Sequence, residues 1–214
     1  MERLGGKFIV LDGPEGCGKS TQIQLLRQRL VEQGLRVRVF RDPGATRIGE
    51  KIRGILLDPV HDEMGMRCEM LLYMAARAQM MTQSILPALK AGEVVLCDRF
   101  VSSTLAYQLG GEGLSAEEIR AVADIAIQHR WPDLTIILDM PAEHSLARVR
   151  REKDRIEQRP LAYHQQVRAN FLAQAAADRR RYRVVEAHRP VETVSADIWQ
   201  VVTEEGAVLS EPRA

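Results

Sequence analysis

A glycine-rich segment near the N-terminus combines a lysine and a serine at a spacing that binds phosphate. The segment reads Gly13-x-x-x-x-Gly18-Lys19-Ser20, and it follows an apolar run and precedes residues with helical spacing. Backbone N–H groups of such a loop can point at a phosphate because glycine has no Cβ to block its approach. The lysine reaches the β- and γ-phosphates, and the serine hydroxyl can ligate Mg²⁺. The sequence therefore predicts a nucleotide-binding P-loop.

An acidic and a basic residue follow the third predicted strand. Asp98 and Arg99 come directly after the predicted strand 93–97. At the end of a strand that faces a P-loop, the carboxylate could bind Mg²⁺ or act as a general base, and the guanidinium could bind a phosphate group. The alternative is that the two residues form only a local ion pair.

Arg77 lies in the middle of an apolar helical stretch, residues 63–91, that is rich in methionine. A buried arginine normally needs a partner, or it faces a cleft. We expect Arg77 to face a ligand. The methionines are interpreted as core packing because their flexible side chains fill gaps between elements.

A basic cluster lies after the fourth predicted strand. Five of the eight residues from Arg148 to Arg155 are lysine or arginine. In an ordinary protein this cluster would be a solvated helix surface. After the fourth strand of a P-loop protein it instead indicates a mobile arginine lid that closes over phosphates.

The order of elements predicts an α/β fold. Strands are expected at 8–11, 35–40, 93–97, 133–140 and 183–186, and helices at 21–32, 46–57, 63–91, 102–108, 115 onward, 141–157, 160–180 and 196–204. The helix at 115 begins with a Ser115-x-x-Glu118 capping box. Strands interleaved with helices predict a five-stranded parallel sheet between two helical layers, as in P-loop NTPases.

Right-handed crossovers would bring the ends of the first three strands to one edge of this sheet. Lys19, Arg41, Asp98 and Arg99 would then meet in one crevice. We expect a single domain over residues 1–214, with a short arginine-rich lid at about 148–160.

Composition limits the other classes of function. The chain has 30 basic and 29 acidic residues, for a net charge of +1, so no overall field favours nucleic acid or membrane surfaces. Its three cysteines lack a C-x-x-C spacing, and no apolar run reaches transmembrane length. We therefore expect a cytoplasmic protein that binds neither nucleic acid nor membrane.

Five separated motifs, the P-loop among them, resemble those of thymidylate kinases. Residues 98–108 resemble the family signature D-R-[FYH]-x-x-S-x-x-A-Y-Q, and the P-loop resembles G-x-E-G-x-G-K-[ST]-T. Residues 41–46, 75–79 and 154–158 are similar to R-E-P-G-G-T, A-A-R-x-Q and D-R-[IF]-E-Q in the same order. The P-loop Glu15 together with lid arginines resembles the bacterial type of this P-loop nucleoside monophosphate kinase family.

The resemblance implies phosphorylation of dTMP to dTDP by ATP with Mg²⁺, a homodimer, and a role in supplying DNA precursors. It implies ATP binding by Gly13, Pro14, Glu15, Gly16, Cys17, Gly18, Lys19, Ser20 and Thr21. It implies dTMP binding by Glu15, Arg41, Tyr73, Arg77, Arg99, Thr104, Tyr107 and Gln108. It implies catalytic roles for Lys19, Asp98, Arg99, Arg150, Arg151 and Arg155, with Ser20 and Asp98 at the metal.

The chain departs from the family pattern at two positions. Asp42 stands where the family usually has Glu, and we expect its shorter carboxylate to fall short of a direct partner. Ala45 replaces the second glycine and disfavours a positive φ.

Two rival functions remain open. The first is another small-molecule P-loop kinase acting on a different nucleotide or deoxynucleoside. The second is a regulatory module that binds a nucleotide but does not catalyse phosphoryl transfer. The intact Lys19, Ser20 and Asp98 and the lid arginines weigh against the second. Arg99 and Arg41 favour an acceptor that already carries a phosphate.

Overall fold

The computed structural model of the chain describes residues 4–149 and 152–208. Its sheet has five strands in the order β2-β3-β1-β4-β5, and every pair of neighbours is parallel. The strands are β1 (Phe8–Asp12), β2 (Val37–Arg41), β3 (Val94–Asp98), β4 (Leu134–Asp139) and β5 (Tyr182–Glu186). The predicted five-stranded parallel sheet is confirmed.

Helices connect and cover these strands. They are α1 (Lys19–Glu32), α2 (Arg47–Leu57), α3 (Met66–Met80), α4 (Leu86–Lys90), α5 (Val101–Tyr107), α6 (Ala116–Ala126), α7 (Ala142–Ala147), α8 (Leu161–Ala177) and α9 (Val191–Val208). A π-helical turn, η2 (Met81–Ile85), joins α3 to α4, and a 3₁₀ turn, η3 (Gly111–Gly113), precedes α6. None of these helices combines the length and the apolar character needed to span a membrane.

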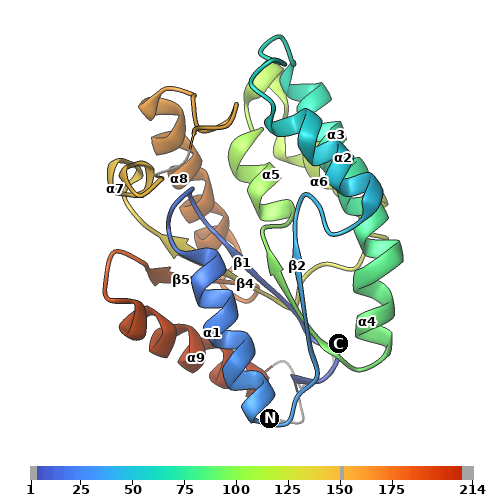
Figure 1. Cartoon of the computed structure of the whole chain (residues 1–214), viewed down its shortest axis with the longest axis vertical. Helices are drawn as coiled ribbons and strands as arrows, with labels where there is room; N and C mark the ends of the chain where they lie inside the picture. The colour runs from blue at the N-terminus through green and yellow to red at the C-terminus, as the bar shows by residue number, and fades with distance from the viewer. Residues whose placement is uncertain (1–3, 150–151, 209–214) are drawn as a thin grey trace.

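The sheet is buried on both faces, which makes a three-layer α/β/α architecture. Apolar residues of α1 and α9 pack on one face, and those of α3, α5 and α6 pack on the other. Figure 1 shows α1 and α9 together on one side of the strands. A third apolar cluster joins α5 to α8. Because both faces are covered, ligands have access to this sheet only at its edges and ends.

Two helix starts follow their sequence signals. The Thr46 side chain accepts a hydrogen bond from Gly49 N at 2.9 Å and caps α2. Ser115 and Glu118 form the predicted capping box at the start of α6. Such caps supply partners for backbone N–H groups that the helix leaves free.

Two predicted helix boundaries were wrong. The helix after Pro141 does not run through residue 157 but ends at Ala147, and the last helix begins at Val191 rather than at residue 196. Beyond α7, the Asp154 carboxylate accepts hydrogen bonds from the backbone N–H groups of Ile156 and Glu157. A short polar side chain that bonds its own backbone competes with a continuous helix.

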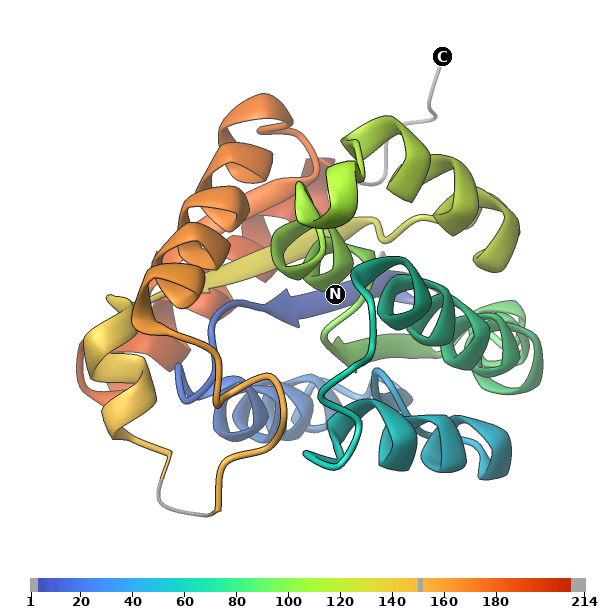
Figure 2. The ribbon, with the colours of Figure 1, turned by 90° about the horizontal axis from the view of Figure 1, so that it is seen from above.

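The connection between α7 and α8 turns back toward the end of α2. Arg155 N donates to Leu57 O at 3.2 Å, and Figure 2 shows this connection approaching the one between α2 and α3. Two segments about 100 residues apart in the sequence therefore share one side of the crevice above the sheet.

Candidate active site

The loop after β1 requires its glycines. Gly13, Gly16 and Gly18 have φ values of 139°, 71° and 98°, which L side chains rarely adopt. A Cβ on Gly16 would lie 2.2 Å from Ser145 O, and one on Gly13 would lie 2.5 Å from Leu138 O. The close packing of β4 and α7 against this loop therefore fixes its shape, and the loop opens directly into α1 as a P-loop must.

Lys19 is buried and spans the P-loop. Its Nζ donates to Gly13 O at 3.1 Å and to Pro14 O at 2.7 Å. An ammonium held by carbonyl oxygens at the N-terminus of a helix lies where the β- and γ-phosphates of a nucleotide bind.

Ser20 and Asp98 offer oxygen ligands beside the P-loop. The Ser20 hydroxyl donates to Asp98 Oδ2 at 2.8 Å, although the residues are 78 positions apart. Within residues 4–149 and 152–208, no group of three His, Cys, Asp or Glu side chains could hold a metal ion by itself. This donor set fits Mg²⁺, which usually takes one or two carboxylates and completes its shell with water and substrate phosphates.

Arg99 connects the P-loop to a neighbouring pocket. Its Nη1 donates to Gly13 O and to Ser103 Oγ, both at 3.0 Å, and its Nη2 donates to Glu15 Oε1 at 2.5 Å. Burial alone would lower the pKa of Arg99, but Glu15, Tyr107 and Asp12 raise it well above its usual value. Arg99 also has a φ of 69°, a strained backbone of the kind that clusters at ligand sites.

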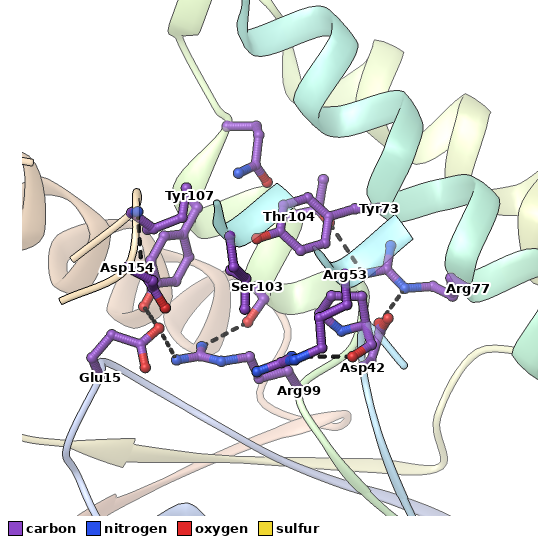
Figure 3. A pocket seen from close by; sticks show the side chains of 14 residues that line it. Glu15, Asp42, Arg53, Tyr73, Arg77, Arg99, Ser103, Thr104, Tyr107 and Asp154 are labelled. Atoms are coloured by element: carbon purple, nitrogen blue, oxygen red, sulfur yellow. Dashed lines mark hydrogen bonds and ion pairs between the residues drawn. The ribbon is translucent and has the colours of Figure 1, made fainter. Parts of the chain in front are cut away.

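A pocket lies beside Arg99 and reaches from the P-loop residue Glu15 to Arg77 on α3. Its empty volume is about 550 Å³ with the solvent at its mouth included. Figure 3 shows Glu15 and Tyr107 at one end of the pocket and Asp42 and Arg77 at the other. The residues that line it are Glu15, Asp42, Pro43, Arg53, Leu57, Tyr73, Arg77, Arg99, Ser103, Thr104, Tyr107, Gln108, Asp154 and Ile156.

Arg77 both lines this pocket and has a buried partner. Its Nε donates to Asp42 Oδ2 at 2.6 Å, and its Nη2 donates to Phe100 O and to Thr104 Oγ1 at 3.2 Å. The expectation that Asp42 could not reach a partner directly was therefore wrong. Ala45 nevertheless adopts the positive φ that its Cβ disfavours, at 59°, with its N–H bonded to Glu50.

Two tyrosines supply the aromatic walls of the pocket. Burial raises the pKa values of Tyr73 and Tyr107, so both phenols stay protonated at neutral pH. The Arg99 guanidinium lies 5.3 Å from the centroid of the Tyr107 ring. The hydroxyl of Tyr107 lies 3.4 Å from Glu15 Oε1. The ring is thus held at the junction between the P-loop and the pocket.

Arg41 does not meet Arg99 in the pocket, although the sequence predicts that it would. Its side chain is exposed and pairs with Glu50 at 3.1 Å, and it does not line the pocket. Arg53, which sequence reasoning missed, lines the pocket instead and donates to Pro43 O at 3.1 Å. The available signal was a basic residue on α2, the helix that begins directly after the loop of residues 41–46.

The structure also separates the predicted lid residues. Arg155 is buried and donates to Leu56 O at 2.9 Å and to Glu69, so it does not line the pocket. Its neighbours Asp154 and Ile156 do line it. Arg150 and Arg151 lie outside the described residues.

Sequence reasoning also missed Asp12 at the end of β1. This fully buried carboxylate accepts hydrogen bonds from Ser102 Oγ at 2.6 Å and from Ser103 Oγ at 2.7 Å. It lies 3.3 Å from Arg99 Nη1. Asp12 therefore fixes the start of α5 and the guanidinium of Arg99, and a carboxylate directly before the P-loop was the signal for it.

Comparisons with known proteins agree with this geometry. The family model described as thymidylate kinase matches residues 11–198. The thymidylate kinase of Pelotomaculum thermopropionicum is 46% identical over 204 residues, covering 94% of each chain, and that of Pseudomonas fluorescens is 47% identical over 197 residues, covering 91% of this chain and 94% of the relative. The crystal structure of thymidylate kinase from Ehrlichia chaffeensis superposes with a TM-score of 0.75 at 28% identity, covering 93% of this chain and 99% of that one. The chain therefore belongs to the thymidylate kinase family.

Proposed function

We propose that this protein transfers the γ-phosphoryl group of ATP to the phosphate of dTMP, giving dTDP and ADP. The observation that carries the proposal is the position of Arg99. Its guanidinium touches the P-loop at Gly13 O and lines the adjacent pocket. A single fixed cation can therefore contact a phosphate that sits between the donor loop and the acceptor pocket.

The donor nucleotide binds at the P-loop in this proposal. Lys19 and the loop N–H groups hold the β- and γ-phosphates, where they stabilise the charge that spreads over the transferred group. Phosphoryl transfer needs little covalent work from the protein, so the alignment of the two phosphates supplies most of the rate.

The acceptor binds in the pocket in this proposal. Arg99 and Arg53 contact its phosphate, and Tyr107 packs beside the sugar. Arg77 and Thr104 face the thymine carbonyl edge at the far end, and Tyr73 packs against the ring. Two cations that line the pocket, Arg99 and Arg53, and hydrogen-bonding groups at its far end suit a nucleoside monophosphate better than a free nucleoside.

Ser20 and Asp98 are proposed to hold Mg²⁺. When bound, the ion neutralises charge on the donor phosphates. Asp98 also lies in register with Leu11 on the neighbouring strand β1, which keeps its carboxylate beside the P-loop.

The remaining proposals concern organisation. We propose one domain with a lid at about residues 148–160, a homodimer, and a cytoplasmic location. The three free cysteines support the last of these, because reduced thiols are typical of that compartment. Light scattering on the purified protein tests the dimer, and cell fractionation tests the location.

The decisive experiment is an ADP-release assay with ATP and Mg²⁺. It is run with dTMP, dUMP, dCMP, AMP and thymidine as separate acceptors. We expect strong turnover with dTMP and weak or no turnover with the others. A faster reaction with another monophosphate would reassign the base end of the pocket, and turnover of thymidine would overturn the role of Arg99. No turnover with any acceptor would favour the regulatory nucleotide-binding module.

A further inference from the structure

One buried carboxylate outside the pocket ties together three separate segments. Glu69 is 0% exposed and does not line the pocket. Its Oε1 accepts from Gln108 Nε2 at 2.6 Å. Its Oε2 accepts from Arg159 Nη2 at 2.7 Å and from Arg155. The proposed phosphoryl transfer uses none of these contacts directly.

Each of the three segments supplies part of the pocket wall. On α3, Tyr73 lies one helical turn after Glu69. Gln108, the C-terminal cap of α5, lines the pocket itself. Asp154 and Ile156 flank Arg155 and also line the pocket. Displacement of any of these segments from Glu69 would therefore change the shape of the pocket.

The network continues to the backbone at the end of α5. Arg159 Nη1 lies 2.6 Å from the hydroxyl oxygen of Tyr163, and that hydroxyl donates to Tyr107 O at 2.8 Å. Burial raises the pKa of Tyr163 to about 12, so the phenol stays neutral and can donate. The same guanidinium lies 4.6 Å from the centre of the Tyr163 ring. Tyr107 is thus connected to Glu69 through Arg159 and Tyr163.

The positive charges of Arg155 and Arg159 make this network depend on the negative charge of Glu69. Two guanidinium groups, from the side chains of Arg155 (7% exposed) and Arg159 (19% exposed), meet at a single Glu69 oxygen. Without a negative charge at that point the two cations would repel one another in a poorly solvated space, because charges removed from water need a partner. An uncharged side chain of the same shape would keep the bond to Gln108 but not hold both arginines.

We propose that Glu69 is a positioning residue that fixes the shape of the acceptor pocket by anchoring residues 154–159 to α3 and α5. The proposal deepens the proposed function, on which it rests. In this proposal Glu69 holds both Arg155 and Gln108 in place. The side-chain amide of Gln108 donates its hydrogen bond to Glu69. Glu69 itself does not touch the substrate.

The test is Glu69→Gln, which keeps the shape of the side chain and removes its charge. We expect the KM for dTMP to rise about tenfold or more, since small misplacements at a reacting site are costly, while the KM for ATP stays within about twofold. The matched control is Glu93→Gln, which removes another ion-paired glutamate, the partner of Arg38 at the far end of β3. The control is expected to leave both KM values unchanged.

Amide hydrogen exchange without substrate provides an independent readout. In Glu69→Gln, residues 152–160 are expected to exchange faster while β1 and β3 keep their protection. A lower thermal midpoint with both KM values and this exchange unchanged would mean that Glu69 has only a packing role. Equal increases in both KM values would also overturn the proposal.

A second variant covers the case in which Glu69→Gln does not fold. Arg159→Gln removes the more exposed of the two cations, and we expect a smaller rise in the KM for dTMP alone. An unchanged KM would contradict the anchor. Failure of the proposed function gives a different result, because the unsubstituted protein would then not phosphorylate dTMP at all, and the exchange experiment would still report on the anchor.

Discussion

Arg77 Nε lies 2.6 Å from Asp42 Oδ2, and both side chains are only 1% exposed. The second carboxylate oxygen, Asp42 Oδ1, is buried and has no hydrogen-bond partner in the described part of the chain. Asp42 and Arg77 both line the pocket. The pair therefore fixes a donor at the far end of the pocket and leaves a buried acceptor oxygen, which favours a ligand that can donate to it.

Arg77→Ala is expected to reduce both stability and substrate affinity. Removing one member of a buried ion pair leaves an uncompensated charge, so the free energy of unfolding should fall by about 3–5 kcal/mol. The KM for dTMP should rise far more than that for ATP. Urea melts and steady-state kinetics measure the two effects, and Arg38→Ala, which breaks an exposed pair, should cost about 1 kcal/mol or less. Equal changes in both KM values would mean that Arg77 only packs.

Arg53 and Arg41 form a matched pair for testing the acceptor phosphate. Both are arginines close to the loop of residues 41–46, but Arg53 lines the pocket and Arg41 is exposed beside Glu50. A hydrogen bond to a charged group contributes about 1.5–3 kcal/mol, so Arg53→Ala should raise the KM for dTMP about tenfold or more. Arg41→Ala should change it about twofold or less. A larger rise in the KM for dTMP in Arg41→Ala than in Arg53→Ala would instead support the phosphate contact that the sequence predicts for Arg41.

Lys19→Ala and Asp98→Ala are expected to reduce turnover and preserve the fold. Both remove charge that acts on the transferred group or on its metal, and losses of this kind are about 100-fold or more in kcat. Single-turnover kinetics measure the chemical step, and circular dichroism checks the fold. Normal turnover in either variant would remove that residue from the mechanism.

Gly16→Ala is expected to disrupt the P-loop through a steric clash. A Cβ there would lie 2.2 Å from Ser145 O, whereas Gly34 has a similar positive φ with nothing within 4 Å. Gly34→Ala should therefore lower the free energy of unfolding by only about 1 kcal/mol, the cost of placing a side chain at a positive φ. Gly16→Ala should lower the free energy of unfolding by more than this, as measured by urea melts. It should also weaken ATP binding, as measured by calorimetry. Equal destabilisation in the two variants would show that φ, not the contact with α7, restricts the loop.

His164 should make stability depend on pH. It is a buried residue of α8, and burial lowers its pKa below the ordinary value of 6.5. The unfolded chain therefore takes up the proton at a higher pH than the folded chain, so stability is lost as the pH falls below about 6.5. In His164→Gln this loss should disappear. Urea melts of both proteins between pH 5 and pH 8 measure it, and parallel curves for the two would contradict the assignment.

The fold class and the P-loop could be predicted from the amino-acid sequence alone. Strand runs, glycine spacing and helix caps are local signals, and the loop from Gly13 to Lys19 works largely through its own backbone. The alternation of strands and helices then leaves few topologies, because parallel strands need right-handed crossovers. The position of Asp98 beside Ser20 followed from that topology before any side chain was placed.

The positions of the other charged side chains depend on contacts between distant segments and could not be predicted from local sequence. Arg41 and Arg53 are both basic residues near the same loop, but Glu50 holds the first outside the pocket and α2 directs the second into it. Arg155 resembles a lid arginine in sequence, yet Glu69 holds it in a buried pair 86 positions away. Long side chains go where an opposite charge satisfies them, and the partner is set by the packing of distant segments.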